Sequence, residues 1–254
     1  MSNFSEVGHT KNVANFEDLI SRCTGFGVVY NPSLNAIKIA NMNTLRTNAL
    51  AALASVISTH TAYMNAVDAR EIIFEPLQKF ATRIMSALKA CGASDAVIKD
   101  ATTIHRKIQG KRAKPIKEVP IQQAMVIDPN NPTPVEPVHI SVSQLSYDSI
   151  VDHYSILIDL LTSVVAYTPN ENELKIAGLN TLLTSMKTAN TAVITATTNF
   201  NNARINRNDI LYKKDTGLVD VAQECKNYVK SVFGSTHAKY KEVSGIKFTK
   251  RRGS

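Results

Sequence analysis

The chain has 254 residues, with 29 lysines and arginines against 21 aspartates and glutamates, and its formal net charge is +8. This charge favours acidic partners such as nucleic acid, an anionic membrane surface or an acidic protein surface, but it establishes none of them. The start of the chain lacks the pattern of a secretory signal, and polar residues interrupt every apolar run before it could span a membrane. We therefore expect a soluble protein without a membrane span, made in the cytoplasm, with its final location left open.

The chain contains an internal repeat that organises its predicted elements. Residues 30–45 return as residues 167–182 with nine of the sixteen positions identical, and the same offset joins Val56-Ile57 to Val193-Ile194 and Arg70 to Arg207. Self-similarity of this kind predicts a duplicated architecture. We predict a first helical repeat unit over 1–108, a proline-rich extended linker over 109–142 and a second helical repeat unit over 143–254.

Each predicted repeat unit opens with a helix of about seventeen residues, near 12–28 in the first copy and 144–165 in the second. A Tyr-x-Pro segment ends this helix in both copies, because the residue before proline is pushed out of the α region. Asn35 and Asn172, or the residues just before them, are then expected to cap the next helix.

That next helix is predicted to run from about 35 to 70 and again from about 172 to 206. Its apolar residues follow a 3-4 spacing, which places them on one helix face. They are Met42, Leu45, Ala49, Ala52, Val56, Thr59, Tyr63 and Ala66 in the first copy, and Leu179, Leu182, Met186, Ala189, Val193, Ala196, Phe200 and Ala203 in the second. Such a helix is about 50 Å long, so two shorter helices must share its length.

A third helix is predicted to start at Leu77 and at Leu218, after Pro76 in the first copy and Thr216-Gly217 in the second. Gly92 and Gly234 are expected to end it, and each is followed by a short fourth helix containing Ile98 or Tyr240. The linker after the first copy holds six of the nine prolines. Because it also contains isoleucine and valine, we expect part of it to lie along the helices or to pair as a short strand.

Few residues have the spacing of a catalytic or metal site. Glu6 and His9 have the E-x-x-H spacing of helical metal sites, but they stand alone, and such sites need further carboxylates. His60 and His153 are expected to be structural, and phosphate-loop, nucleophile-elbow and zinc-protease motifs do not occur. We predict that the protein is not an enzyme and has no catalytic, cofactor-binding or metal-binding residues.

The three cysteines, Cys23, Cys91 and Cys225, are far apart in the sequence and lack C-x-x-C spacing. An odd number with this spacing predicts neither a disulfide framework nor a zinc site. They are expected to be small core residues in a reducing compartment.

Both copies end in a basic run, which supplies the candidate interaction residues. They are Arg106, Lys107, Lys111, Arg112, Lys114 and Lys117 in the first copy, and Lys247, Lys250, Arg251 and Arg252 in the second. Such a run is a solubilising surface, a nucleic-acid contact or a contact with acidic patches of neighbouring subunits. The long helices are also rich in asparagine and threonine, which predicts either a solvated face or a close lateral contact with another subunit.

The C-terminal residues 207–220, 228–234 and 248–252, together with 143–148 and the Tyr-x-Pro segments, resemble a family of uncharacterised all-helical bacterial hypothetical proteins. The resemblance covers most of the chain. It implies an all-helical fold and carries no activity or functional residue.

We predict an all-α, internally duplicated, elongated helical bundle with two long spine helices and shorter flanking helices. The leading hypothesis for function is a non-enzymatic structural or interaction protein that assembles with itself into an oligomer or a filament. The alternative is a nucleic-acid-associated protein that binds through the basic clusters at the ends of the two repeats.

Overall fold

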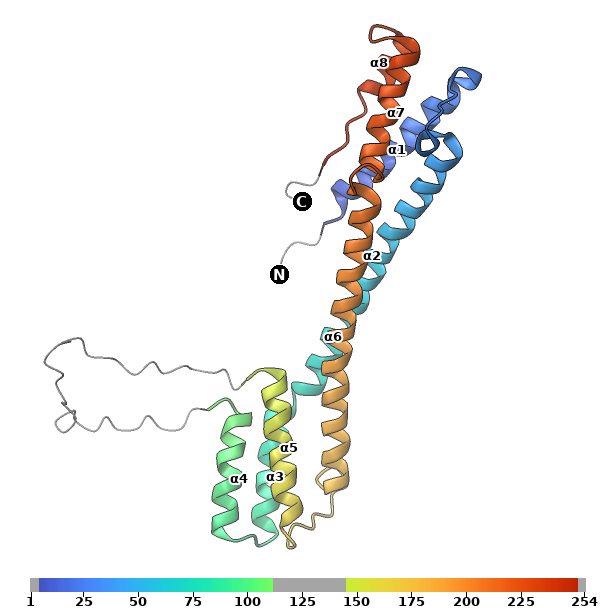
Figure 1. Ribbon diagram of the computed structural model, residues 1–254. Helices are drawn as coiled ribbons and strands as arrows, with labels where there is room; N and C mark the ends of the chain where they lie inside the picture. Colours follow the sequence, from blue (N-terminus) through green and yellow to red (C-terminus); the bar gives the residue numbers. More distant parts are fainter. Residues whose placement is uncertain (1–4, 112–144, 251–254) are drawn as a thin grey trace, which may run out of the picture. The chain divides into compact units, whose positions relative to one another are not determined.

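The computed structural model describes residues 5–111 and 145–250, and all regular structure in these ranges is helical. Figure 1 shows the arrangement of the elements within it. The helices are α1 (Val7–Gly25), α2 (Ile39–Phe74), α3 (Leu77–Ala90), α4 (Asp95–Ile108), α5 (Tyr147–Ser163), α6 (Ile176–Tyr212), α7 (Leu218–Phe233) and α8 (Ala238–Ser244), with 3-10 turns at Gly27–Val29 and Asn35–Ile37. The prediction of an all-α protein is confirmed.

The two long helices, α2 and α6, start about four residues later than predicted and extend several residues further. The later start arises because each Tyr-x-Pro segment leads into a turn that the tyrosine stabilises. The hydroxyl of Tyr30 donates a hydrogen bond of 2.7 Å to the carbonyl of Ile37, and that of Tyr167 donates one of 2.8 Å to Leu174. The prediction that Asn35 and Asn172 cap these helices is therefore wrong.

The apolar series predicted along α2 and α6 faces inward. Every one of its sixteen positions is buried or half-buried, from Met42 and Leu179 near the start of each helix to Ala66 and Ala203. Further along the chain, α3 and α7 begin at the predicted residues, and Gly92 and Gly234 follow them with φ of 75° and 83°. This left-handed conformation favours glycine, which explains why both helices stop there.

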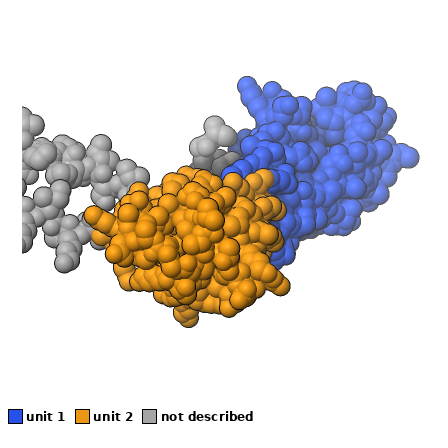
Figure 2. Space-filling model, turned by 90° about the horizontal axis from the view of Figure 1, so that it is seen from below, with its two compact units in different colours: residues 1–66, 194–254 blue, residues 67–193 orange. Residues whose placement is uncertain are grey.

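The described chain forms two compact units, coloured separately in Figure 2. Unit 1 takes in residues 1–66 and 194–254, and unit 2 takes in residues 67–193. These units do not coincide with the helical repeat units predicted at 1–108 and 143–254. The boundaries fall inside α2 and α6, so each long helix gives one part to one unit and the rest to the other, and each unit contains helices from both predicted repeats. From residue 112 on, the predicted linker 109–142 lies outside the described residues.

The core of unit 1 combines the opening helix α1 with α7 and α8. Phe16, Leu19 and Cys23 of α1 are fully buried with Ala222 and Cys225 of α7. The core of unit 2 combines α3 and α4 with α5, where Ile84, Leu88 and Ile108 are buried with Tyr154 and Leu157. Burial of a large aliphatic or aromatic side chain contributes about 1.5–3 kcal/mol, so these contacts dominate the stability of each unit.

Candidate functional site

The basic residues predicted as interaction sites are divided between the two units. Arg106 and Lys107 lie in the last turn of α4 and Lys111 follows it, so these three belong to unit 2. Lys247 and Lys250 lie after α8 in unit 1. The other members of the two clusters, Arg112, Lys114, Lys117, Arg251 and Arg252, lie outside the described residues.

The segment that carries Lys247 and Lys250 is held against α1 by side-chain amides. Asn12, which is 1% exposed, accepts a hydrogen bond from the Thr249 amide at 3.0 Å and donates one to its carbonyl at 2.9 Å. Asn15 donates to the carbonyl of Lys247 at 2.6 Å, and Lys250 pairs with Asp220 at 3.2 Å. These contacts fix the backbone of the segment, while Lys247 and Lys250 remain exposed.

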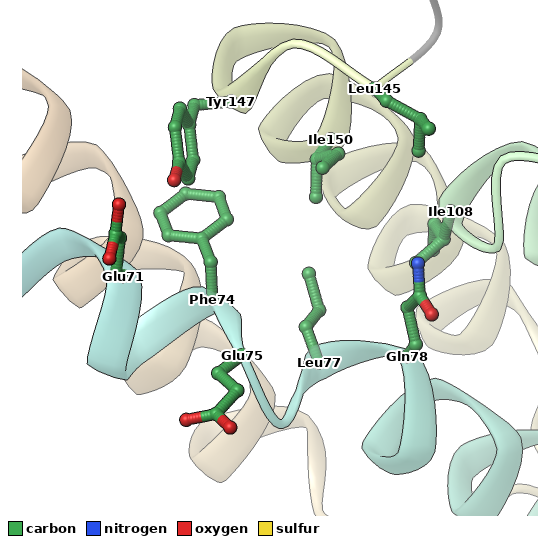
Figure 3. A pocket seen from close by; sticks show the side chains of 9 residues that line it. All are labelled: Glu71, Phe74, Glu75, Leu77, Gln78, Ile108, Leu145, Tyr147 and Ile150. Atoms are coloured by element: carbon green, nitrogen blue, oxygen red, sulfur yellow. The ribbon is translucent and has the colours of Figure 1, made fainter. Parts of the chain in front are cut away.

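A pocket of about 450 Å³ lies within unit 2, between α2, α3, α4 and α5 (Figure 3). Phe74 and Tyr147 meet edge to face with ring centroids 4.8 Å apart, and the guanidinium of Arg70 lies 3.8 Å from the centre of the Tyr147 ring. Leu77 and Ile150 also line the pocket, and Figure 3 shows these two side chains pointing towards each other. The wall of this pocket is therefore mainly apolar and aromatic.

The polar groups of the lining are the carboxylates of Glu71 and Glu75, the amide of Gln78 and the hydroxyl of Tyr147. Carboxylates beside an apolar wall can attract a cation or an amphiphile. The lining contains neither a cysteine nor a serine.

The side chains of Glu6 and His9 each contact a residue of α6. The carboxylate of Glu6 forms an ion pair with Arg207 of α6, in which the side chains are 11% and 5% exposed. The Nδ1 atom of His9 lies 2.7 Å from the hydroxyl of Tyr212. Among the residues that the structure describes, no group of three or more histidine, cysteine, aspartate or glutamate side chains could hold a metal ion.

The structure brings two of the three cysteines together, which the sequence analysis missed. The sulfur atoms of Cys23 in α1 and Cys225 in α7 are 3.4 Å apart, and both residues are fully buried. The hydroxyl of Tyr30 lies 3.2 Å from the sulfur of Cys225. Burial and the neighbouring Cys225 raise the pKa of Tyr30, so its hydroxyl stays protonated. No local spacing could have revealed this pair, because its members are about 200 residues apart.

Two long stretches of the spine helices carry no formal charge. No aspartate, glutamate, lysine or arginine occurs from Thr47 to Val67 of α2, or from Thr188 to Ala203 of α6. Ile57 and Ile194, which occupy matching places in the sequence repeat, are nevertheless 53% and 64% exposed. An exposed helix face normally carries charged side chains, so these uncharged stretches differ from an ordinary solvated surface.

No described helix is both long enough and apolar enough to cross a membrane. Comparison with protein-family models, with curated proteins and with solved structures finds no match to this chain. The resemblance to all-helical bacterial proteins therefore stays an expectation, and a functional proposal must come from the residues themselves.

Proposed function

We propose that the protein is a non-enzymatic structural protein that assembles with further copies of itself through the uncharged stretches of α2 and α6. The observation that carries this proposal is the exposure of Ile57 and Ile194 within these stretches. Both residues belong to unit 1.

On α2 the exposed residues include a stripe of Leu50, Ala54, Ile57 and Thr61, which we call the α2 stripe. Their 4-3-4 spacing places them on one helix face. Leu50 is 44% exposed, so two large aliphatic side chains meet water there. Burial of an aliphatic side chain in a contact between copies removes this apolar area from water, which is the main driving force for association.

On α6 the corresponding exposed residues are Ile194, Thr198 and Asn201, which we call the α6 stripe. Thr198 donates its hydroxyl to the carbonyl of Ile194 at 3.0 Å, and in the α2 stripe Thr61 does the same to Ile57 at 3.1 Å. A hydroxyl whose proton is bonded within its own helix depends less on water, and the threonine methyl group adds to the apolar surface. The two stripes are therefore less polar than their composition suggests.

A second copy of the chain is the partner that these stripes fit best. The protein carries a net charge of +8, so two copies repel each other over most of their surfaces. The stripes carry none of that charge, and the small side chains among them, Ala54, Thr61 and Thr198, let two helices approach closely. Contact between identical uncharged faces avoids the repulsion and leaves few long side chains to immobilise.

The test measures the mass of the protein by sedimentation velocity over a concentration series, comparing the wild type with a double variant, Ile57→Lys with Ile194→Lys. We expect the wild type to self-associate without nucleic acid. The double variant should associate at least about tenfold more weakly, because each lysine places a hydrated charge in the contact.

Ile72→Lys is the matched control, because Ile72 also lies on α2 and is 70% exposed, but stands outside the uncharged stretch. A wild type that stays monomeric at every concentration would overturn the proposal, as would an equal loss of association in the control. Assembly that appears only with added nucleic acid and weakens steeply with salt would favour the basic clusters instead.

A further inference from the structure

The core of unit 1 contains a compact group of sulfur and hydroxyl side chains. Cys23 and Cys225 have sulfur atoms 3.4 Å apart, and the Tyr30 hydroxyl lies 3.2 Å from Cys225 and 3.7 Å from the sulfur of Met42. The three cysteines of the described residues are all free thiols, but Cys91 lies in unit 2, away from this group. Two thiols in contact are placed where a cross-link could form.

We propose that Cys23 and Cys225 are a redox-active pair, which hydrogen peroxide converts into an intramolecular disulfide that joins α1 to α7. A disulfide bond is about 2.0 Å long, so the two sulfur atoms must approach by a little over one ångström. Side-chain rotation with a small shift of either helix is enough for such a movement, so unit 1 can keep its fold.

The reaction needs only peroxide as the oxidant. One cysteine, as the thiolate, attacks a peroxide oxygen, the O–O bond breaks, and a sulfenic acid forms while hydroxide takes up the thiol proton and leaves as water. The sulfur of the other cysteine then attacks the sulfenic sulfur and the S–O bond breaks, while the departing hydroxide takes up the proton of that second thiol and leaves as water. The sum is two thiols and one peroxide giving one disulfide and two waters.

The surroundings make the two thiols unequal. The hydrogen bond with Cys23 lowers the pKa of Cys225, although burial acts against it. The hydrogen bond with Cys225 and burial raise the pKa of Cys23. These directions favour Cys225 as the thiol that attacks peroxide first, with Cys23 resolving the sulfenic acid.

Access to the pair requires opening of the core, because both residues are 0% exposed. Peroxide is little larger than water, and local opening of a helix is enough to admit it. Once formed, the bond links the opening helix of the chain to a helix about 200 residues later. Such a link restricts the unfolded chain strongly, so oxidation should raise the thermal stability of unit 1.

The test uses the full wild-type chain, treated with hydrogen peroxide, quenched with catalase, and then unfolded in an alkylating agent. We expect the number of alkylatable thiols to fall from three to one. Tryptic digestion should then give a cross-linked pair of peptides, residues 23–38 with residues 215–226, that separates on reduction with dithiothreitol. The melting temperature should rise on oxidation and return on reduction.

Cys225→Ser and Cys23→Ser are two independent controls, each of which should lose the cross-linked peptide and the rise in melting temperature. The proposal is overturned if all three thiols survive a peroxide treatment that oxidises the unfolded chain. It is also overturned if the cross-link contains Cys91, or if thiols are lost without the link between residues 23 and 225.

Discussion

Ion pairs in this protein differ in their surroundings more than in their chemistry. Arg207 and Glu6 form a buried pair in unit 1, and Arg207 also donates to the side-chain oxygen of Asn208 at 2.7 Å. Arg83 and Glu173 form a similar pair in unit 2, but their side chains are 54% and 56% exposed. Water competes for the exposed pair and screens it, whereas removal of one buried partner leaves the other charge without compensation.

We therefore expect Arg207→Ala to reduce the free energy of unfolding by about 3–5 kcal/mol, because Glu6 would remain buried without its cation. The matched change Arg83→Ala should reduce it by at most about 1 kcal/mol. Urea unfolding followed by circular dichroism measures both. Equal losses in the two variants would contradict the assignment of Arg207 as a buried structural partner.

For the two long helices, the sequence predicted the buried face correctly and the first residue incorrectly. Periodicity identified the inward face of α2 and α6, because burial selects apolar residues at helical spacing. It could not place the first residue, since the tyrosine hydrogen bonds to Ile37 and Leu174 hold the preceding segment in a non-helical turn. These two bonds join residues at matching places in the sequence repeat.

The start of α2 and the start of α6 differ at one matching position of the sequence repeat, residue 41 in α2 and residue 178 in α6. In α2, Asn41 donates a hydrogen bond of 2.7 Å to the carbonyl of Asn35. In α6, Gly178 stands at the matching place, and a Cβ atom there would lie 2.3 Å from the carbonyl oxygen of Asn172. The second copy therefore requires glycine because its backbone passes closer to the helix.

Gly178→Ala should destabilise the protein by about 1–3 kcal/mol, because the clash is with backbone atoms that cannot rotate away. Gly8→Ala is the control, since a Cβ atom at Gly8 of α1 would have no neighbour within 4 Å. That change should leave stability unchanged or raise it slightly, because alanine favours helix. Thermal unfolding measures both, and an unaffected Gly178 variant would show that the turn can move.

At the scale of the whole molecule, the sequence predicted the helices but not how they group. The compact units divide α2 and α6, and each unit takes its core from both halves of the chain. Local periodicity predicts which face of a helix is buried, but it does not predict which distant helix packs against that face. The contact between Cys23 and Cys225 was missed for the same reason, because only the packing of α1 on α7 brings these residues together.

This grouping predicts that the two halves of the chain remain together after the connection between them is cut. A specific protease site can be inserted among residues 112–144, outside the described part of the chain. After cleavage we expect both fragments to elute as one species at the mass of the uncut protein, because each core contains helices from both fragments. Fragments that separate without denaturant would contradict the grouping.

The division of unit 1 into two stretches of sequence also sets an order for its biosynthesis. Unit 2 is continuous from Val67 to Val193, so a ribosome delivers all of it before the second stretch of unit 1 begins at Ile194. At about 5–20 residues per second, α1 and the first part of α2 must wait on the order of ten seconds or more for α7. During that interval the apolar side chains of α1, including Phe16 and Leu19, lack the part of their core that α7 and α8 supply, although Met42 and Leu53 of α2 are already present. This order predicts that unit 2 can fold first during synthesis, and that the core of unit 1 is completed only after α7 and α8 have been made.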